Sequence, residues 1–228
     1  MIANKKEFYG GLALLVLFFA VLVVMFQPLF DGKNSMAYLD NMYNSISKGS
    51  VYYVPAIRTD AEQLNGKEYT LKLQYNSEVE AKQSANLFQQ AGVRTTLTGS
   101  NIEISGPINA ILSASLDDSE LMYHNKSEEI TAKYGLEPRR AMFNWWTSLH
   151  QVEKALKAQE EFKAAKVTST TIKKAVEASY NYYEIEPMKI MDNIGMVIFS
   201  LIFYVFYTLW YGFAILFVFE GWGLRLSH

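Results

Sequence analysis

The sequence predicts an α+β membrane protein in which two transmembrane helices flank an extracytoplasmic β-α-β-β-α module and an antiparallel helical hairpin. Three observations lead to this prediction: two long runs without charged residues, an alternating strand pattern followed by an amphipathic helix, and apolar residues at helical spacing in the second half of the chain. Half of the 228 residues are hydrophobic, yet the mean hydropathy is near zero. Very apolar segments are therefore joined to an ordinary polar domain.

The two apolar runs lie near the two ends of the chain. The first extends from Phe8 to Phe26 and the second from Ile194 to Phe219. About 20 helical residues cross a hydrocarbon core of roughly 30 Å, so each run is long enough to be a span. Because Lys5 and Lys6 precede the first run and no small-residue cleavage site closely follows it, we expect an uncleaved signal anchor. The predicted boundaries are a tail at 1–7, transmembrane helices at 8–30 and 193–220, and a tail at 221–228.

Charged residues beside the spans predict the orientation of the chain. The tails carry Lys5, Lys6 and Arg225, whereas the central segment carries Lys33 and Lys189 close to the spans. Positive residues favour the cytoplasmic side, so this slight excess predicts that both termini are cytoplasmic. The protein is then expected in the cell (inner) membrane, with its central domain in the periplasm or an equivalent extracytoplasmic space.

The segment 31–125 has the pattern of a small α+β module. Alternating or β-rich runs predict strands, and amphipathic periodicity predicts helices. Ser77 and Glu80 form a capping box at the start of one helix, a Gly-Ser pair marks a hairpin turn, and Pro55 favours a sheet edge. The predicted elements are, in order, a helix within 31–50, strands at 51–57 and 69–75, a helix at 77–92, strands at 93–99 and 101–106, and a helix at 107–123.

The segment 126–192 is predicted to form the helical hairpin. Its first helix begins at Pro138 and extends to about 166, and a short Ser/Thr link at 168–171 leads to the second helix. Apolar residues in the first helix recur at spacings of 3, 4, 3 and 4, which predicts a seam for a partner helix. This helix seam consists of Met142, Trp145, Leu149, Val152 and Leu156.

The second apolar run contains hydroxyl-bearing residues near its centre, where the interfacial aromatic belt does not explain them. They follow Ser200 at spacings of 4, 7, 8 and 11 and so lie along one stripe of a helix. This hydroxyl stripe consists of Ser200, Tyr204, Tyr207, Thr208 and Tyr211. An unpaired hydroxyl is costly in hydrocarbon, and residues 12–26 carry no polar side chain. We therefore expect the stripe to face another chain; the alternative is that its hydroxyls bond to backbone carbonyls.

The sequence predicts no catalytic residue, cofactor or metal ion. Without cysteine, thiolate chemistry is excluded. Asp117, Glu120 and His124 are spaced to share a helix face and could bind a divalent cation, but acidic helix faces are more often simply solvated. The stretch EPRRAMFNWW at 137–146 combines arginines with aromatic residues, a composition that can hold phosphates, sugars or headgroups. Packing of these aromatic residues on the α+β module is the interpretation that we favour.

These features predict a non-catalytic accessory or structural subunit of a multi-subunit membrane complex. It would contact other integral membrane subunits through the second transmembrane helix and the extracytoplasmic domain, in a hetero-complex rather than a homo-oligomer, and would not bind nucleic acid. The predicted tails are too short for a signalling domain, and spans without acids or bases disfavour a transporter acting alone.

A homo-oligomeric envelope scaffold is the first alternative. Two spans around an α+β domain with a long helix resemble, in topology, the polysaccharide co-polymerases that regulate glycan chain length. That resemblance implies a ring of identical chains. The family carries a proline-rich, glycine-spaced motif near its second span, whereas IEPMKIMDNIG has one proline at this place. An enzyme acting on envelope substrates is the second alternative, and no assembled catalytic constellation supports it.

Overall fold

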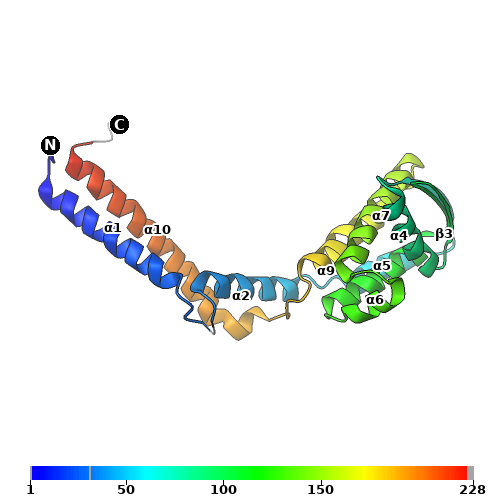
Figure 1. Ribbon diagram of the computed structural model, residues 1–228, viewed down its shortest axis with the longest axis horizontal. Helices are drawn as coiled ribbons and strands as arrows, with labels where there is room; N and C mark the ends of the chain where they lie inside the picture. Colours follow the sequence, from blue (N-terminus) through cyan, green and yellow to red (C-terminus); the bar gives the residue numbers. More distant parts are fainter. Residues whose placement is uncertain (1, 31, 225–228) are drawn as a thin grey trace. The chain divides into compact units, whose positions relative to one another are not determined.

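The computed structural model describes residues 2–30 and 32–224, so Arg225 and the rest of the predicted C-terminal tail lie outside the described residues. The chain divides into two compact units (Figure 1). The first unit combines Met1–Ile46 with Met188–His228, and the second unit comprises Ser47–Pro187.

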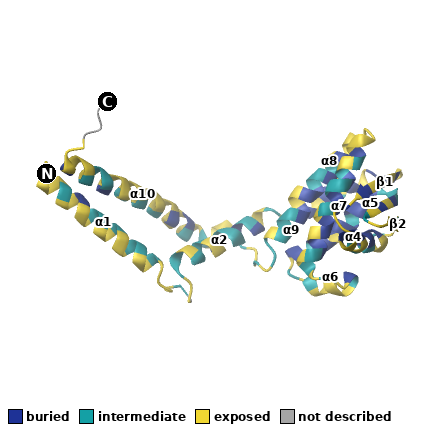
Figure 2. Ribbon diagram, turned by 45° about the horizontal axis from the view of Figure 1, so that its top comes forward, coloured by how far each residue is buried: buried dark blue, intermediate teal, exposed yellow. Residues whose placement is uncertain are grey.

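Two long helices, α1 (Lys5–Met25) and α10 (Ile194–Trp222), dominate the first unit. Their mean hydropathies of 2.6 and 2.0, the second including the preceding turn η2 (Ile190–Asn193), confirm two helices long and apolar enough to cross a membrane. In Figure 2 both helices are mainly exposed or intermediate, unlike the helices of a soluble core. The helix α2 (Ser35–Ser50), most of which belongs to this unit, confirms the amphipathic helix predicted within 31–50.

The helices α1 and α10 lie side by side and run in opposite directions (Figure 1). Small residues make this packing close. A Cβ atom on Gly11 would lie 2.7 Å from the backbone nitrogen of Val218 and 2.9 Å from the carbonyl oxygen of Ala214, and one on Gly221 would collide with the backbone of Phe8. Since only hydrogen fits at these positions, the glycines let the two backbones approach, as small residues do between membrane helices.

The second unit contains a three-stranded antiparallel sheet of β1 (Glu68–Gln74), β2 (Arg94–Thr98) and β3 (Asn101–Pro107), in the order β1-β3-β2. These strands confirm the predictions at 69–75, 93–99 and 101–106. Buried and exposed residues alternate along β1, so one face of the sheet enters the core and the other faces solvent. The β2–β3 turn contains Gly99 at φ 59°, a conformation that glycine adopts without strain.

Helices cover the buried face of the sheet. Figure 2 shows that the buried residues of this unit gather where these helices meet one another and the strands. α4 packs on β2, and α7 packs on β1 and on α8. The helices are α3 (Val54–Glu62), α4 (Glu78–Gln90), α5 (Ile108–Tyr123), α6 (Ser127–Tyr134), α7 (Pro138–Ala158), α8 (Phe162–Thr171), the π-helix η1 (Ile172–Val176) and α9 (Glu177–Asn181). α4 and α5 confirm the helices predicted at 77–92 and 107–123.

The strand predicted at 51–57 is wrong, because residues 54–62 form α3. Valines and tyrosines gave this stretch its β-rich appearance. Pro55, interpreted as an edge-strand residue, instead occupies the first turn of the helix. At that position the missing N–H costs nothing, since the first amides of a helix have no intrahelical acceptor.

The hairpin turn predicted at 168–171 is also wrong, because α8 continues through these residues. The chain reverses at 159–161. There Glu160 adopts φ 62°, its amide donates to the Lys157 carbonyl, and the Glu161 amide donates to the Leu156 carbonyl. This pair of bonds is a Schellman motif, which usually places glycine where Glu160 stands. The sequence therefore gave no signal for the turn.

Candidate interaction site

Three members of the hydroxyl stripe have partners inside the first unit, and two of them, Ser200 and Tyr207, link α10 to other helices. The Tyr43 hydroxyl lies 2.7 Å from Ser200 Oγ, and Ser200 Oγ donates to the Val197 carbonyl at 2.9 Å. Because the single Ser200 proton serves Val197, the Tyr43 hydroxyl is the donor in the first bond. Ser200 therefore fastens α10 to α2.

Tyr207 is the second member with a partner, and it fastens α10 to α1. Its hydroxyl donates to the backbone carbonyl of Phe18 at 3.0 Å, and the two rings stack with centroids 4.2 Å apart. Trp210 Nε1 makes a similar bond to the Leu14 carbonyl at 3.2 Å. A helical carbonyl keeps a second lone pair that can accept these donors. The first span thus supplies polar partners through its backbone, although it has no polar side chain between residues 12 and 26.

Tyr204 and Thr208 face outward, whereas the ring of Tyr211 lies 5.0 Å from the Phe18 ring on α1 and is only partly exposed. Thr208 Oγ1 donates to the Tyr204 carbonyl of its own helix at 2.7 Å. Tyr204 and Tyr211 are 68% and 43% exposed, and within the described residues neither hydroxyl has a hydrogen-bond partner. They lie seven residues apart, two helical turns, on either side of the centre of α10. We call these two residues the outward tyrosine pair.

All five residues of the helix seam lie in the core of the second unit. Met142, Trp145, Leu149, Val152 and Leu156 are all fully buried. α7 buries this seam against the sheet and α8, its neighbour in the hairpin.

One buried charge lies at the end of the seam. Asp118 accepts hydrogen bonds from the Tyr134 hydroxyl at 2.5 Å, from Trp145 Nε1 at 2.6 Å and from Lys133 Nζ at 2.9 Å. Burial, together with the adjacent carboxylate, raises the pKa of Tyr134 far above its usual range. With three donors around it the carboxylate is satisfied, so this cluster joins α5, α6 and α7 and does not form an open site.

The carboxylates considered for metal binding are engaged in surface ion pairs. Arg58 Nη2 lies 2.7 Å from Asp117 and 3.3 Å from Glu120. The Tyr52 hydroxyl donates to Glu120 at 2.5 Å, and this bond, aided by burial, raises the pKa of Tyr52 to about 12. His124 packs against the ring of Tyr52. Among residues 2–30 and 32–224, no group of three His, Cys, Asp or Glu residues could hold a metal ion.

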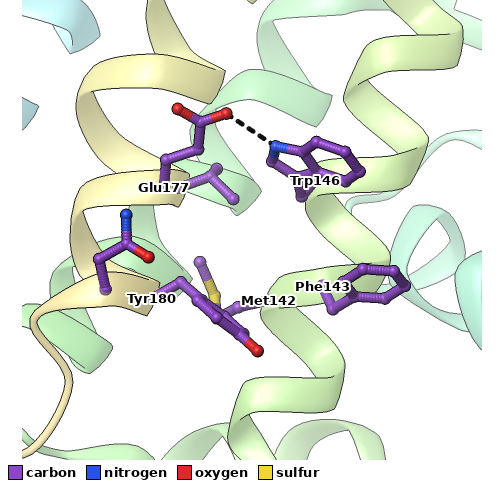
Figure 3. A pocket seen from close by; sticks show the side chains of 7 residues that line it. Met142, Phe143, Trp146, Glu177 and Tyr180 are labelled. Atoms are coloured by element: carbon purple, nitrogen blue, oxygen red, sulfur yellow. Dashed lines mark hydrogen bonds between the residues drawn. The ribbon is translucent and has the colours of Figure 1, made fainter.

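An aromatic groove lies between α7 and the following helical segment, η1 and α9. It has a volume of about 360 Å³ and is lined by Met142, Phe143, Trp146, Val176, Glu177, Tyr180 and Asn181. Figure 3 shows Phe143 and Trp146 on one wall, with Tyr180 and Glu177 across the hollow. Trp146 Nε1 donates to Glu177 Oε1 at 2.8 Å. The sequence pattern at 137–146 contained one wall, but the opposite wall became visible only in the folded hairpin.

Comparisons of the chain with protein-family models, with curated proteins and with solved structures find no match. The fold and the site together define a protein with a mixed α+β unit and two helices that could cross a membrane.

Proposed function

We propose that this chain is a non-catalytic accessory subunit of a multi-subunit membrane complex, anchored by α1 and α10. The outward tyrosine pair on α10 would contact another integral membrane subunit. The single observation that carries the proposal is the division of the hydroxyl stripe. Ser200 and Tyr207 are paired within the chain, whereas Tyr204 and Tyr211 present unpaired hydroxyls near the middle of an apolar helix.

The energetic argument favours protein over lipid as the neighbour of this face. A hydroxyl without a partner in an apolar medium costs about 1–3 kcal/mol by protein mutational data. A cross-helix hydrogen bond contributes only about 0.6 kcal/mol on average. The pair would therefore orient a partner helix more than it would bind that helix tightly, and the apolar side chains around it would supply most of the contact.

The antiparallel packing of α1 and α10 supports the proposed topology. Asn4 at the start of α1 donates its amide to the carbonyl of Gly221 at the end of α10, so the start of α1 lies beside the end of α10. If both helices span the membrane, both termini reach one side, and Lys5 and Lys6 favour the cytoplasmic side. The second unit would then be extracytoplasmic. Protease added outside sealed vesicles of known orientation tests this arrangement.

The decisive experiment replaces both outward tyrosines and compares the result with a matched variant. The double variant Tyr204→Phe, Tyr211→Phe keeps the rings and removes the two unpaired hydroxyls. At about 0.6 kcal/mol per bond, it should weaken association roughly eightfold. Tyr207→Phe removes one hydroxyl from the same helix but breaks only the bond to Phe18, so it should retain the partner.

Native mass spectrometry of gently solubilised protein provides the measurement. Other membrane proteins at fixed stoichiometry are expected with the unmodified chain and with Tyr207→Phe, and at reduced occupancy with the double variant. A ring of this chain alone would instead support the envelope scaffold. If the double variant assembles as well as the unmodified chain, the tyrosine hydroxyls do not form the proposed contact.

A further inference from the structure

The aromatic groove has features that the proposed contact along α10 does not use. Phe143 and Trp146 are 39% and 36% exposed, although Trp145, beside them on α7, is fully buried. Their rings lie 5.9 Å apart and nearly parallel, and Trp146 is held in place by its bond to Glu177. Exposed aromatic rings around a hollow are typical of ligand sites, and the volume of about 360 Å³ falls within the usual range for small molecules.

A π-helical turn forms part of the opposite wall. The segment Ile172–Val176 interrupts the helix formed by α8 and α9, and its last residue, Val176, and the next residue, Glu177, line the groove. π-helical turns are rare and occur frequently at functional sites. The backbone irregularity and the exposed rings thus coincide at one place in the fold.

The negative charge of the groove lining indicates which class of ligand it can bind. Aromatic rings present a negative face, and the Glu177 carboxylate adds a full negative charge. A ligand with negative charge alone would be repelled by Glu177 and the ring faces in the lining itself, because the two nearby guanidinium groups, Arg139 and Arg140, stand beside the groove and not among its lining residues. A strongly hydrated metal ion would have to exchange its water shell for a single carboxylate. A sugar needs several hydrogen-bond partners, whereas Met142, Val176 and the rings make most of the lining apolar. A cation covered by methyl groups fits both the charge and the apolar walls.

We infer that the aromatic groove binds a quaternary ammonium group, such as the trimethylammonium of choline. The ammonium lies between Trp146 and Tyr180, with its charge toward Glu177. Two guanidinium groups stand beside the groove, Arg139 at 5.9 Å from the Tyr180 ring and Arg140 at 5.5 Å from the Phe143 ring. They favour a ligand that also carries an anion, so phosphocholine is the first compound to test.

The test compares a cation with its neutral isostere. The full chain is purified in a detergent without choline headgroups and titrated calorimetrically with phosphocholine, with choline and with 3,3-dimethyl-1-butanol, in which carbon replaces the nitrogen of choline. Binding of the two cations is expected, with the neutral alcohol at least about tenfold weaker, since cation–π attraction is strongest in desolvated sites. Equal binding of choline and the alcohol, or no binding of either cation, overturns the inference.

Three variants locate the site. Glu177→Gln keeps the side-chain shape and removes the charge, and Trp146→Leu removes one ring; each should weaken choline binding about tenfold. Phe162→Ala removes an exposed ring of α8 outside the groove and should bind choline as the unmodified chain does. Circular dichroism verifies that each variant is folded. Unchanged binding by Glu177→Gln would contradict the assignment even if Trp146→Leu failed to fold.

Two further experiments test whether the ligand is a lipid headgroup, and whether binding in the groove depends on the proposed contact along α10. In nanodiscs, phosphatidylcholine should compete with soluble phosphocholine if the ligand is a lipid headgroup, and phosphatidylglycerol discs serve as the control. Unchanged binding in both discs indicates a soluble ligand of the same chemistry. The Tyr204→Phe, Tyr211→Phe variant should bind choline normally, so a failure of the partner proposal leaves this inference separately testable.

Discussion

Replacing Asp118 with asparagine should destabilise the second unit strongly, because no orientation of the amide satisfies its neighbours. One carboxylate oxygen of Asp118 accepts from both Tyr134 and Trp145, and the other accepts from Lys133. An amide has one oxygen and one NH₂ group. If its oxygen serves the two rings, the NH₂ group faces the Lys133 ammonium; if its oxygen serves Lys133, two buried donors lose their acceptor.

The expected cost follows from the burial of the cluster. Removing one partner of a buried ion pair typically costs about 3–5 kcal/mol. Asp118 is fully buried, but the Lys133 side chain is 30% exposed and can recover some hydration. We therefore expect about 3 kcal/mol, the low end of the range. For a domain of roughly 150 residues this loss lowers the melting temperature by about 6–12 °C.

The neighbouring residue provides a matched control. Asp117 precedes Asp118 on α5, is 57% exposed and pairs with Arg58 at 2.7 Å. A pair at the surface contributes about 0–1 kcal/mol, so Asp117→Asn should shift the transition little. Thermal unfolding of the full chain in detergent, followed by near-ultraviolet circular dichroism, compares the two variants. Equal shifts for Asp118→Asn and Asp117→Asn would refute the argument from burial.

Two further predictions concern helix packing and pH. Gly11→Ala should separate α1 from α10 and cost about 1–3 kcal/mol, whereas Gly10→Ala has open space and should be neutral or slightly stabilising; cross-linking yields between the two helices distinguish them. Burial raises the pKa of Tyr75 to about 12, partly offset by its hydrogen bond with Ser148, so the unfolded chain releases this proton first. The contribution of Tyr75 to the free energy of unfolding is fully present below pH 10 and declines as pH rises to 12, by at most about 3 kcal/mol, as urea titrations at these pH values should detect. Tyr75→Phe should lack this part of the alkaline loss; an equal loss in both proteins would contradict the prediction.

The predictable parts of the fold are those that rest on periodicity. The two uncharged runs became α1 and α10, and the alternation at 69–75 became β1, because burial imposes these patterns directly on the side chains. The errors arose where local chemistry was ambiguous. Pro55 suits both an edge strand and a first helical turn, and the turn at Glu160 uses a residue that usually avoids positive φ.

The misplaced turn also explains why the aromatic groove could not be predicted. In an antiparallel hairpin the position of the turn decides which residues face each other. The reversal at 159–161 places Trp146 beside Glu177, and Arg139 beside Tyr180. A turn near residue 170 would have set Trp146 opposite the start of the second span, near residue 194. Because the turn was predicted about ten residues too late, the sequence could not show that Glu177 and Tyr180 form the second wall of the groove.

The hydroxyl stripe shows a different limit of sequence reasoning. Its spacing singled out five residues along α10, but side chains alone could not show which of them are paired. Phe18 and Leu14 contribute only backbone carbonyls, and these carry no signature in the sequence. The inward and outward members of the stripe could be separated only when α1 was placed against α10.

The helix α7 links the stability of the second unit to its candidate binding site. One side of α7 buries the helix seam, while Phe143 and Trp146 on another side line the groove. Gln151 on α7 donates to the carbonyl of Gln74, and Gln159, directly after α7, donates to the carbonyl of Thr70. These bonds occupy backbone carbonyls of the edge strand β1, which could otherwise pair with a strand of another chain. Since the same helix is fixed by the seam and by the sheet edge, the exposed rings are held on a rigid support, which is what selective binding of a small cation requires.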